Sequence, residues 1–571
     1  MFRESTTALH AAAPAGFAQL PLAARVRAAS SATALSALIP GSAYAHAVAR
    51  CTLFLAVPAA MVLTAVATPA IHHLVAWALL WELTGLGTLD GPLGTGLPWS
   101  TTIWFRLKVG TLKQSILGLS TRSYLDVALY LLLLASLLQD LLTVAPTMPA
   151  RTLCLYTALC ALDRSAYTGS QGAYYWTLCA CCCWPGVAPD ERTNALRFVQ
   201  CMHLLIPGIA KAGPWFVSVT PTMAGMSPLV PARAGAMLFR DLLRGDVRPS
   251  WLGRMVGHGG TAAEILIPLG WCVGSPAWVC SACALLGLGM HLYIVTMLPI
   301  GSVLEWNAVN GILVYVLFAG EHGGAISFSF VGGGWHPYLL SLWLVLLWFL
   351  LVGPLTAHVQ PTWFSNHFAL RKYTGNHPFH TFLVKKSALQ KLNAVPGAKV
   401  FVEMAAVSKG AASNDGEDDE DEDAQAWRSA ALLSTLVRQR LNAKPLCKIF
   451  ALAVEGKHSW KDYARIVNSH FFGNAMLDVT FVNRSLLTRL REACGLKKGE
   501  MYSIKIDSFP TIQCAGYVAG WSVTDVGADS VKAGGEMEIV WSEAGDVGVT
   551  LKDERGGFIG HFSDDDGTKK D

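Results

Sequence analysis

Long apolar stretches alternate with short polar ones over the first 357 residues, and no such stretch follows. Crossing the hydrocarbon core as a helix takes about 20 residues, because the backbone must satisfy its own hydrogen bonds there. The fourth and fifth stretches, near 150–165 and 171–187, are short, so they form either two helices or one re-entrant unit. The pattern predicts an α-helical polytopic membrane protein with about 8–10 transmembrane helices. The candidate spans lie near 46–68, 70–88, 124–145, 150–165, 171–187, 197–217, 258–276, 278–298, 303–320 and 337–357.

Composition agrees with this interpretation. Hydrophobic residues make up 52% of the 571 residues and charged residues only 15%, too apolar for an ordinary soluble protein. The net charge is +4, and the basic residues lie between apolar blocks instead of forming a stripe. Nucleic-acid binding is therefore not expected, and the first partner is the lipid bilayer.

The distribution of basic residues predicts an orientation. Lys and Arg favour cytoplasmic loops, and they collect in the segments 101–123, 218–257 and 359–400, whereas 321–336 contains none. Ten spans that start inside place the three basic segments in the cytoplasm. Both termini are then cytoplasmic.

Five regions follow from these changes in composition. Residues 1–45 are rich in Ala, Ser and Arg, which is typical of a transit peptide, and an untargeted cytosolic extension is equally compatible, so the organelle stays open. The run Asp415 to Asp423 holds eight acidic residues in nine and predicts a disordered linker. The regions are the extension 1–45, the transmembrane domain 46–357, a basic juxtamembrane segment 358–408, the acidic linker 409–425 and a small C-terminal α/β domain 426–571.

The C-terminal region combines helical spacing with alternating strands. "WRSAALLSTLVRQRL" and "RSLLTRLREACGL" have helical periodicity, and "MYSIKIDSF", "IQCAGYVAGWSV" and "EMEIVWS" alternate as half-buried strands. These elements predict a cytoplasmic domain whose protein partner the sequence does not identify.

The sequence lacks three common motifs for nucleotide binding, zinc binding and hydrolysis. A P-loop, an HExxH helix and a nucleophile elbow are absent. The histidine pairs His72-His73 and His377/His380 are isolated from each other, and the cysteines inside apolar segments are interpreted as small packing residues, with palmitoylation or metal binding as the alternative. No metal site is predicted, and no cofactor can be named.

Ionisable residues in consecutive apolar segments form the candidate site. A charge inside the membrane costs about 2.5–3.5 kcal/mol on insertion scales, so it is usually paired or functional. The catalytic candidates are Lys211, Glu264 and His291. The cofactor-binding candidates are His203, His258 and Glu305.

Each candidate also has a structural explanation. Lys211 lies about 9 Å from the end of its span, at 1.5 Å per residue, so its side chain could reach the interface. Ser302 and Glu305 form S-x-x-E, a capping box. Glu264 could pair with Lys211, and His203 could be a hydrogen-bonded packing residue. A buried lysine can be neutral and act as a general base, and a nearby Glu264 opposes this by stabilising the ammonium. The Lys211–Glu264 distance therefore decides between base and ion pair.

From about residue 80 onward, "WELTGLG", "STRSYLDVALYLLLL", "MHLYIVTMLPIGSVLEWN", "RKYTGN" and "LREACGLKKGEMYSIKIDSFP" resemble a family of multi-pass transmembrane proteins of unknown function. That resemblance implies membrane insertion and no activity.

Residues 197–320 show a second, remote similarity. "RFVQCMHLLIPGIAKAGPW", "GHGGTAAEILIP" and "GMHLYIVTMLPIG" resemble in order and spacing the membrane core of vitamin K-dependent gamma-carboxylase and its HTTM relatives. By that likeness Lys211 is the base that deprotonates a reduced quinone, and His258 and His291 mark nearby helices. The carboxylase's large lumenal region has no counterpart, so carboxylation of protein glutamates is not expected.

Two classes of function follow. One is a membrane enzyme or binding protein for a quinone-like or lipid-like molecule, built around Lys211, Glu264 and His291. The other is a non-catalytic scaffold, lipid-binding or transport component whose cytoplasmic domain binds a partner.

Overall fold

The computed structural model describes most of the region between residues 71 and 563. The N-terminal extension, the 46–68 segment, the acidic linker and the helix expected at 427–441 lie outside the described residues. The described residues are 71–84, 106–113, 115–143, 148–167, 172–212, 217, 234, 237–241, 246–273, 277–297, 301–319, 323–327, 336–359, 379–394, 462–467, 484–506, 517–541 and 547–563.

The helices coincide with the apolar segments. Apart from 46–68, every candidate span contains a helix, and the segment 337–357 contains α16, a π-helical turn η5 and α17 in succession. The fourth and fifth segments form separate helices. The elements are α4 (Ile71–Thr84), α6 (Tyr124–Leu142), α7 (Ala150–Leu162), α8 (Arg164–Tyr167), α9 (Gly172–Cys183), α10 (Pro189–Ala210), α13 (Trp251–Val273), α14 (Ala277–Met297), α15 (Gly301–Phe318), α16 (Pro337–Leu347), η5 (Trp348–Val352) and α17 (Gly353–Val359), with a small ribbon of β1 (Phe239–Asp241) and β2 (Asp246–Pro249) before α13.

Three helical stretches in the described part of the chain are long and apolar enough to cross a membrane. They are Tyr124–Leu142, Ala277–Ile294 and Pro337–Thr356. Large apolar side chains on them face outward, among them Leu131 and Leu132 on α6 and Leu285 and Leu286 on α14, all at least 50% exposed. Such faces are unfavourable in water and are expected against lipid. A larger number of spans remains a prediction.

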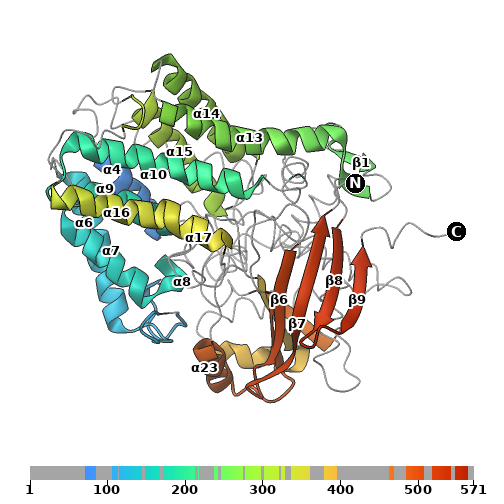
Figure 1. Cartoon of the computed structure of the whole chain (residues 1–571). Helices are drawn as coiled ribbons and strands as arrows, with labels where there is room; N and C mark the ends of the chain where they lie inside the picture. Colours follow the sequence, from blue (N-terminus) through green and yellow to red (C-terminus); the bar gives the residue numbers. More distant parts are fainter. Residues whose placement is uncertain are drawn as a thin grey trace, which may run out of the picture.

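Neighbouring helices pack antiparallel around one apolar core (Figure 1). The Ser136 hydroxyl on α6 lies 2.7 Å from that of Thr152 on α7. On α10 and α13, Cys201 Sγ lies 3.4 Å from Cys272 Sγ, while Gly208 faces Glu264. On α10 and α13 the residue numbers of the two contacts run in opposite directions, so these two helices are antiparallel.

Arginine side chains cover the carboxyl ends of several helices. Arg106 donates to the Leu83 carbonyl of α4 at 2.5 Å. Arg192 donates to the Cys182 carbonyl in the last turn of α9 at 2.5 Å and to the Trp184 carbonyl just after the helix at 2.7 Å. Arg197 reaches the Leu317 carbonyl of α15 at 3.0 Å. The last carbonyls of a helix have no partner within it and carry partial negative charge, so a guanidinium satisfies and stabilises them.

A seven-stranded antiparallel sheet forms the C-terminal part of the structure, on the opposite side of Figure 1 from most of the helices. Its order is β4-β3-β5-β6-β7-β8-β9. The strands predicted from "MYSIKIDSF", "IQCAGYVAGWSV" and "EMEIVWS" correspond to β5, β6 and β7. The strands are β3 (Phe379–Lys385), β4 (Tyr463–Val467), β5 (Met501–Ile506), β6 (Tyr517–Asp525), β7 (Ser530–Trp541), β8 (Val547–Asp553) and β9 (Phe558–Ser563).

The sheet includes a strand from the juxtamembrane segment 358–408. β3 pairs with β5 from Phe379 opposite Ile506 to Val384 opposite Met501, and it pairs with β4 on its other edge. The sheet therefore contains one strand that precedes the acidic linker in the sequence, β3, and six strands that follow it. The helix α23 (Arg484–Cys494) and the 3₁₀ helix η6 (Lys386–Ala394) enclose the apolar core with these strands.

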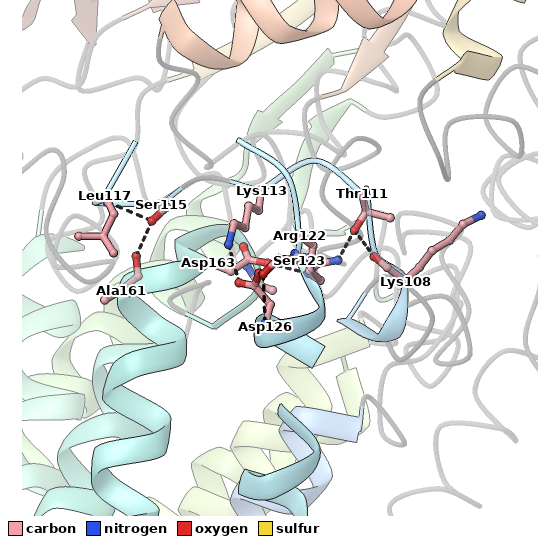
Figure 2. Close-up of polar contacts among 11 residues, drawn as sticks. Lys108, Thr111, Lys113, Ser115, Leu117, Arg122, Ser123, Asp126, Ala161 and Asp163 are labelled. Atoms are coloured by element: carbon pink, nitrogen blue, oxygen red, sulfur yellow. Dashed lines mark hydrogen bonds and ion pairs between the residues drawn. The ribbon is translucent and has the colours of Figure 1, made fainter. Parts of the chain in front are cut away.

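A short hairpin, residues 110–122, joins the helical part to the C-terminal domain. Its backbone pairs through Arg122 N–H to Thr111 O at 2.8 Å and Lys113 N–H to Ser120 O at 3.0 Å. The Leu112 side chain is 2% exposed and belongs to the same apolar core as α23 and β3. Figure 2 shows the hairpin above α6 and α7. This element fixes the C-terminal domain at the end of the bundle where α6 begins.

Candidate functional site

Lys211 and Glu264 form an ion pair between α10 and α13. Lys211 Nζ lies 2.5 and 2.6 Å from the two carboxylate oxygens of Glu264. The Lys211 side chain is 26% exposed and that of Glu264 is 11% exposed. The pair therefore lies at the edge of the helix core, where an outside molecule can reach the ammonium.

The local sequence brings these two helices into close contact. α10 ends at Ala210, and the backbone N–H of the next residue, Lys211, donates to Pro207 O at 3.1 Å. One turn earlier, Gly208 has no side chain, and a Cβ there would lie 3.0 Å from the Glu264 carbonyl carbon. Thr261 Oγ1 donates to Lys211 O at 3.4 Å. The glycine thus allows the close crossing that places Glu264 beside the end of α10.

The short Lys211–Glu264 distance favours an ion pair over a free base at Lys211. A carboxylate with both oxygens on an ammonium stabilises the charged form of the lysine. A pair that is mostly withdrawn from water needs such contacts to offset the loss of hydration. Lys211 is therefore held as one half of an ion pair, and a role as a base requires that pair to open first.

His291 lies deeper in the core and is held by α15. It is 1% exposed, and its Nδ1 lies 2.8 Å from Asn307 Oδ1. With the amide oxygen toward the ring, Nδ1 carries the proton and donates it. Gly311, one turn after Asn307, would place a Cβ 3.5 Å from the His291 Cβ. A small residue there lets the histidine pack directly against α15.

A chain of neutral polar side chains crosses the same core. The Tyr174 hydroxyl on α9 donates to Gln200 Oε1 on α10 at 2.8 Å, and Gln200 Nε2 donates to Asn310 Oδ1 on α15 at 2.6 Å. Asn310 Nδ2 is buried and has no hydrogen-bond partner within the described residues. His203 stacks on the Tyr174 ring at 3.9 Å between centroids. We call Tyr174, Gln200 and Asn310 the polar chain.

The candidates come together only in part. Lys211 and Glu264 are in contact, whereas His203 contacts Tyr174 on α9 and His291 contacts Asn307 on α15. His258 lies on α13 and is exposed, and the Glu305 side chain lies outside the described residues. In the described part of the chain, no three His, Cys, Asp or Glu side chains gather as a metal-binding group.

The polar residues that sequence reasoning missed carry no charge. They are Gln200 on α10, three residues before the candidate His203, and Asn307 and Asn310 on α15, which are also three apart. Residues three apart lie on one side of a helix. Pairs of amide or imidazole residues with this spacing in otherwise apolar helices are the signal that could have found them.

Comparison with known proteins identifies the family. Residues 67–534 match DUF3556, described as a transmembrane protein of unknown function. The chain belongs to this family. No curated protein and no solved structure is significantly similar to the chain. In this DUF3556 protein the matched region includes the Lys211–Glu264 pair, the polar chain and the sheet up to β7. The remote similarity to the carboxylase core stays a prediction.

Proposed function

We propose that this DUF3556 protein binds an amphipathic small molecule, quinone-like or lipid-like, at the edge of its helix core beside Lys211 and Glu264. The observation that carries this proposal is the partly exposed side chain of Lys211, whose ammonium is held on a carboxylate between two helices. Ionisable side chains within apolar helices are costly and are usually retained for binding, transport or catalysis. Sites of this kind combine apolar walls with a few oriented polar groups.

The head group of the ligand would contact Lys211. A quinone carbonyl or a phosphate oxygen is a hydrogen-bond acceptor, and it can accept a hydrogen bond from the Lys211 ammonium. The tail would lie along the apolar helix surfaces, which the membrane already contacts. His203 and His291 would lie on the core side of the ligand, because both are buried in the helix core.

Catalysis is a further step of the same proposal. Within the ion pair Lys211 can pass one proton to Glu264, which leaves a neutral amine and a neutral carboxylic acid. The amine can then accept a proton from a hydroxyl group of the ligand as a general base, and the ligand is left as the oxyanion. His291, fixed by Asn307, would orient the ligand or receive the proton next.

The test compares ligands that copurify with matched ion-pair variants. The double variant Lys211→Met/Glu264→Gln removes both charges together, so that no buried charge is left unpaired. Lys391→Met/Glu500→Gln is the control, because Lys391 Nζ also contacts both oxygens of Glu500, at 2.6 and 2.7 Å, in the C-terminal domain. Proteins are purified in mild detergent, checked for unchanged thermal unfolding, and extracted for mass spectrometry of lipids and quinones.

The proposal expects one molecular species that is enriched over bulk lipid in the wild type and in the control, and is lost from the Lys211/Glu264 variant. Identical contents in all three folded proteins would show that the pair is structural. In that case Lys211 and Glu264 only join α10 to α13.

A C-terminal domain that binds a protein partner is the second candidate function, and exposed apolar side chains on β7 and β9 favour it. Val531 and Val540 on β7 are 62% and 43% exposed, and Phe558 on β9 is 71% exposed. Crosslinking in native membranes should give a protein adduct on the tryptic peptide that contains Phe558. The same adduct in a Phe558→Asp variant would contradict a role for this face.

A further inference from the structure

The hairpin 110–122 is fixed at its base by two buried ion pairs (Figure 2). Lys113 Nζ lies 2.5 Å from Asp126 Oδ1 on α6, with the two side chains 0% and 2% exposed. Arg122 pairs with Asp163, which follows α7, and its Nη1 donates to Thr111 Oγ1 at 2.5 Å. The side chains of Lys113 and Arg122 are therefore both buried against the helices. The hairpin is held rigidly against the ends of α6 and α7.

The tip of this rigid hairpin is apolar and uncovered. Ile116, Leu117 and Leu119 are 60%, 66% and 48% exposed. The tip is nevertheless held in place, because Ile116 N–H and Ser115 Oγ both donate to Ala161 O near the end of α7, at 3.1 and 3.0 Å. Three adjacent apolar side chains presented by a fixed loop indicate a contact surface.

The exposed apolar surface continues onto α6. Tyr124 and Leu125 in the first turn of α6 are 82% and 59% exposed, and α6 is one of the helices able to cross a membrane. Its outward face carries Leu131, Leu132 and Leu138 in the following turns. The tip therefore lies at the end of a lipid-facing helix surface, at the depth where a tyrosine is favoured by the membrane interface.

We propose that Ile116, Leu117 and Leu119 insert into the interface of the same bilayer that α6 crosses. The occupant of the exposed patch is lipid, because the hairpin lies at the end of the bundle where α6, a helix able to cross a membrane, begins with the exposed Tyr124 and Leu125. The inner side of the hairpin is already occupied, since Leu112 packs in the core of the C-terminal domain. The hairpin then holds that domain close to the membrane surface, with one apolar contact in the domain and the other in the lipid.

The inference does not depend on the proposed ligand at Lys211, because it concerns different helices and a different partner. An interfacial loop without regular pairing would expose backbone groups to the bilayer. In the hairpin, the paired backbone and the contacts to Ala161 satisfy several of these groups, and the two buried ion pairs hold the paired backbone in place.

The experiment uses the full chain in phosphatidylcholine nanodiscs, which leave both membrane faces open to reagents. Leu117→Cys is compared with Phe558→Cys, whose native side chain has a similar exposure, 71% against 66%. Trypsin releases the two positions in peptides 114–122 and 556–569, neither of which contains a native cysteine. Labelling by a water-soluble maleimide is followed for each peptide by mass spectrometry. A second nanodisc sample of the wild type carries phosphatidylcholine with a diazirine in its acyl chain.

Insertion predicts maleimide labelling at Leu117→Cys about tenfold slower than at Phe558→Cys, since the interface excludes the reagent. It also predicts photo-crosslinked lipid on peptide 114–122 and none on 556–569. Equal labelling rates would overturn the inference, because the tip would then be in water. Slow labelling without a lipid adduct would also overturn it, because protein and not lipid would cover the tip.

Discussion

Gly208 on α10 faces the backbone of Glu264 on α13 so closely that a Cβ at Gly208 would lie 3.0 Å from the Glu264 carbonyl carbon. The contact sets the spacing of the two helices that carry the Lys211–Glu264 pair. Because the neighbouring atoms are mainly backbone, they cannot move aside as a flexible side chain could.

Gly208→Ala is therefore expected to destabilise the helical part by about 1–3 kcal/mol, the range for overpacking a tight contact. Thermal unfolding of the detergent-solubilised protein measures the effect. Gly259→Ala is the matched control, because a Cβ at Gly259 on α13 meets no atom within 4 Å and alanine favours a helix by about 1 kcal/mol over glycine. Equal melting temperatures for the two variants would contradict the close crossing.

Breaking the buried pair at the base of the hairpin should be costly. Lys113→Met leaves the Asp126 carboxylate buried without its ammonium, and removing one partner of a buried pair typically costs about 3–5 kcal/mol. Lys113→Met/Asp126→Asn should cost less, because no charge is left uncompensated. Unfolding of the single and double variants checks this order. A double variant less stable than Lys113→Met would show that the loss comes from the Ser123–Asp126 helix cap instead.

The Lys391–Glu500 pair predicts a pH dependence in the C-terminal domain. Burial by itself raises the pKa of Glu500, but hydrogen bonds from Lys391 and from the Lys497 N–H outweigh it, so the pKa lies below its ordinary value of 4.5. A lowered carboxyl pKa contributes stability that is present above the unfolded pKa and is lost as the pH falls through the folded one. The protection of the β5 amides from hydrogen exchange, taken relative to the intrinsic exchange rate at each pH, should therefore decrease below pH 4.5, and this decrease should be smaller in Glu500→Gln. An unchanged pH response in that variant would contradict the assignment to Glu500.

Cys494 should resist alkylation. Burial raises the pKa of its thiol to about 11, so almost none of it is thiolate at pH 8, and the thiolate is the reactive form. Peptide-resolved iodoacetamide labelling is expected to be slow at Cys494 in the native protein and fast after unfolding in urea. Comparable rates at pH 8 would mean that α23 opens readily from the sheet.

The sequence predicted the helices well because the requirement that produces them is local. A helix in an apolar environment satisfies its own backbone hydrogen bonds, so the length of an apolar run largely defines the element. α14 covers Ala277–Met297, where the expected span was 278–298, and β5 begins at Met501, where "MYSIKIDSF" begins. Charges in loops were harder to interpret, because Lys113 and Arg122, which counted as signals of orientation, are buried in ion pairs with Asp126 and Asp163.

Which side chains meet was decided only by the tertiary structure. The contact of Lys211 with Glu264 depends on how closely α10 crosses α13, and that distance depends on Gly208. The entry of β3 into the sheet, across the acidic linker, depends on pairing with β5 that no local pattern contains. The position of Leu112 in the core of the C-terminal domain is a third such contact. Apolar periodicity determines where each element forms because it acts between near neighbours in the chain. Contacts between distant segments depend on the packing of all the elements at once, and the sequence of any one segment does not specify them.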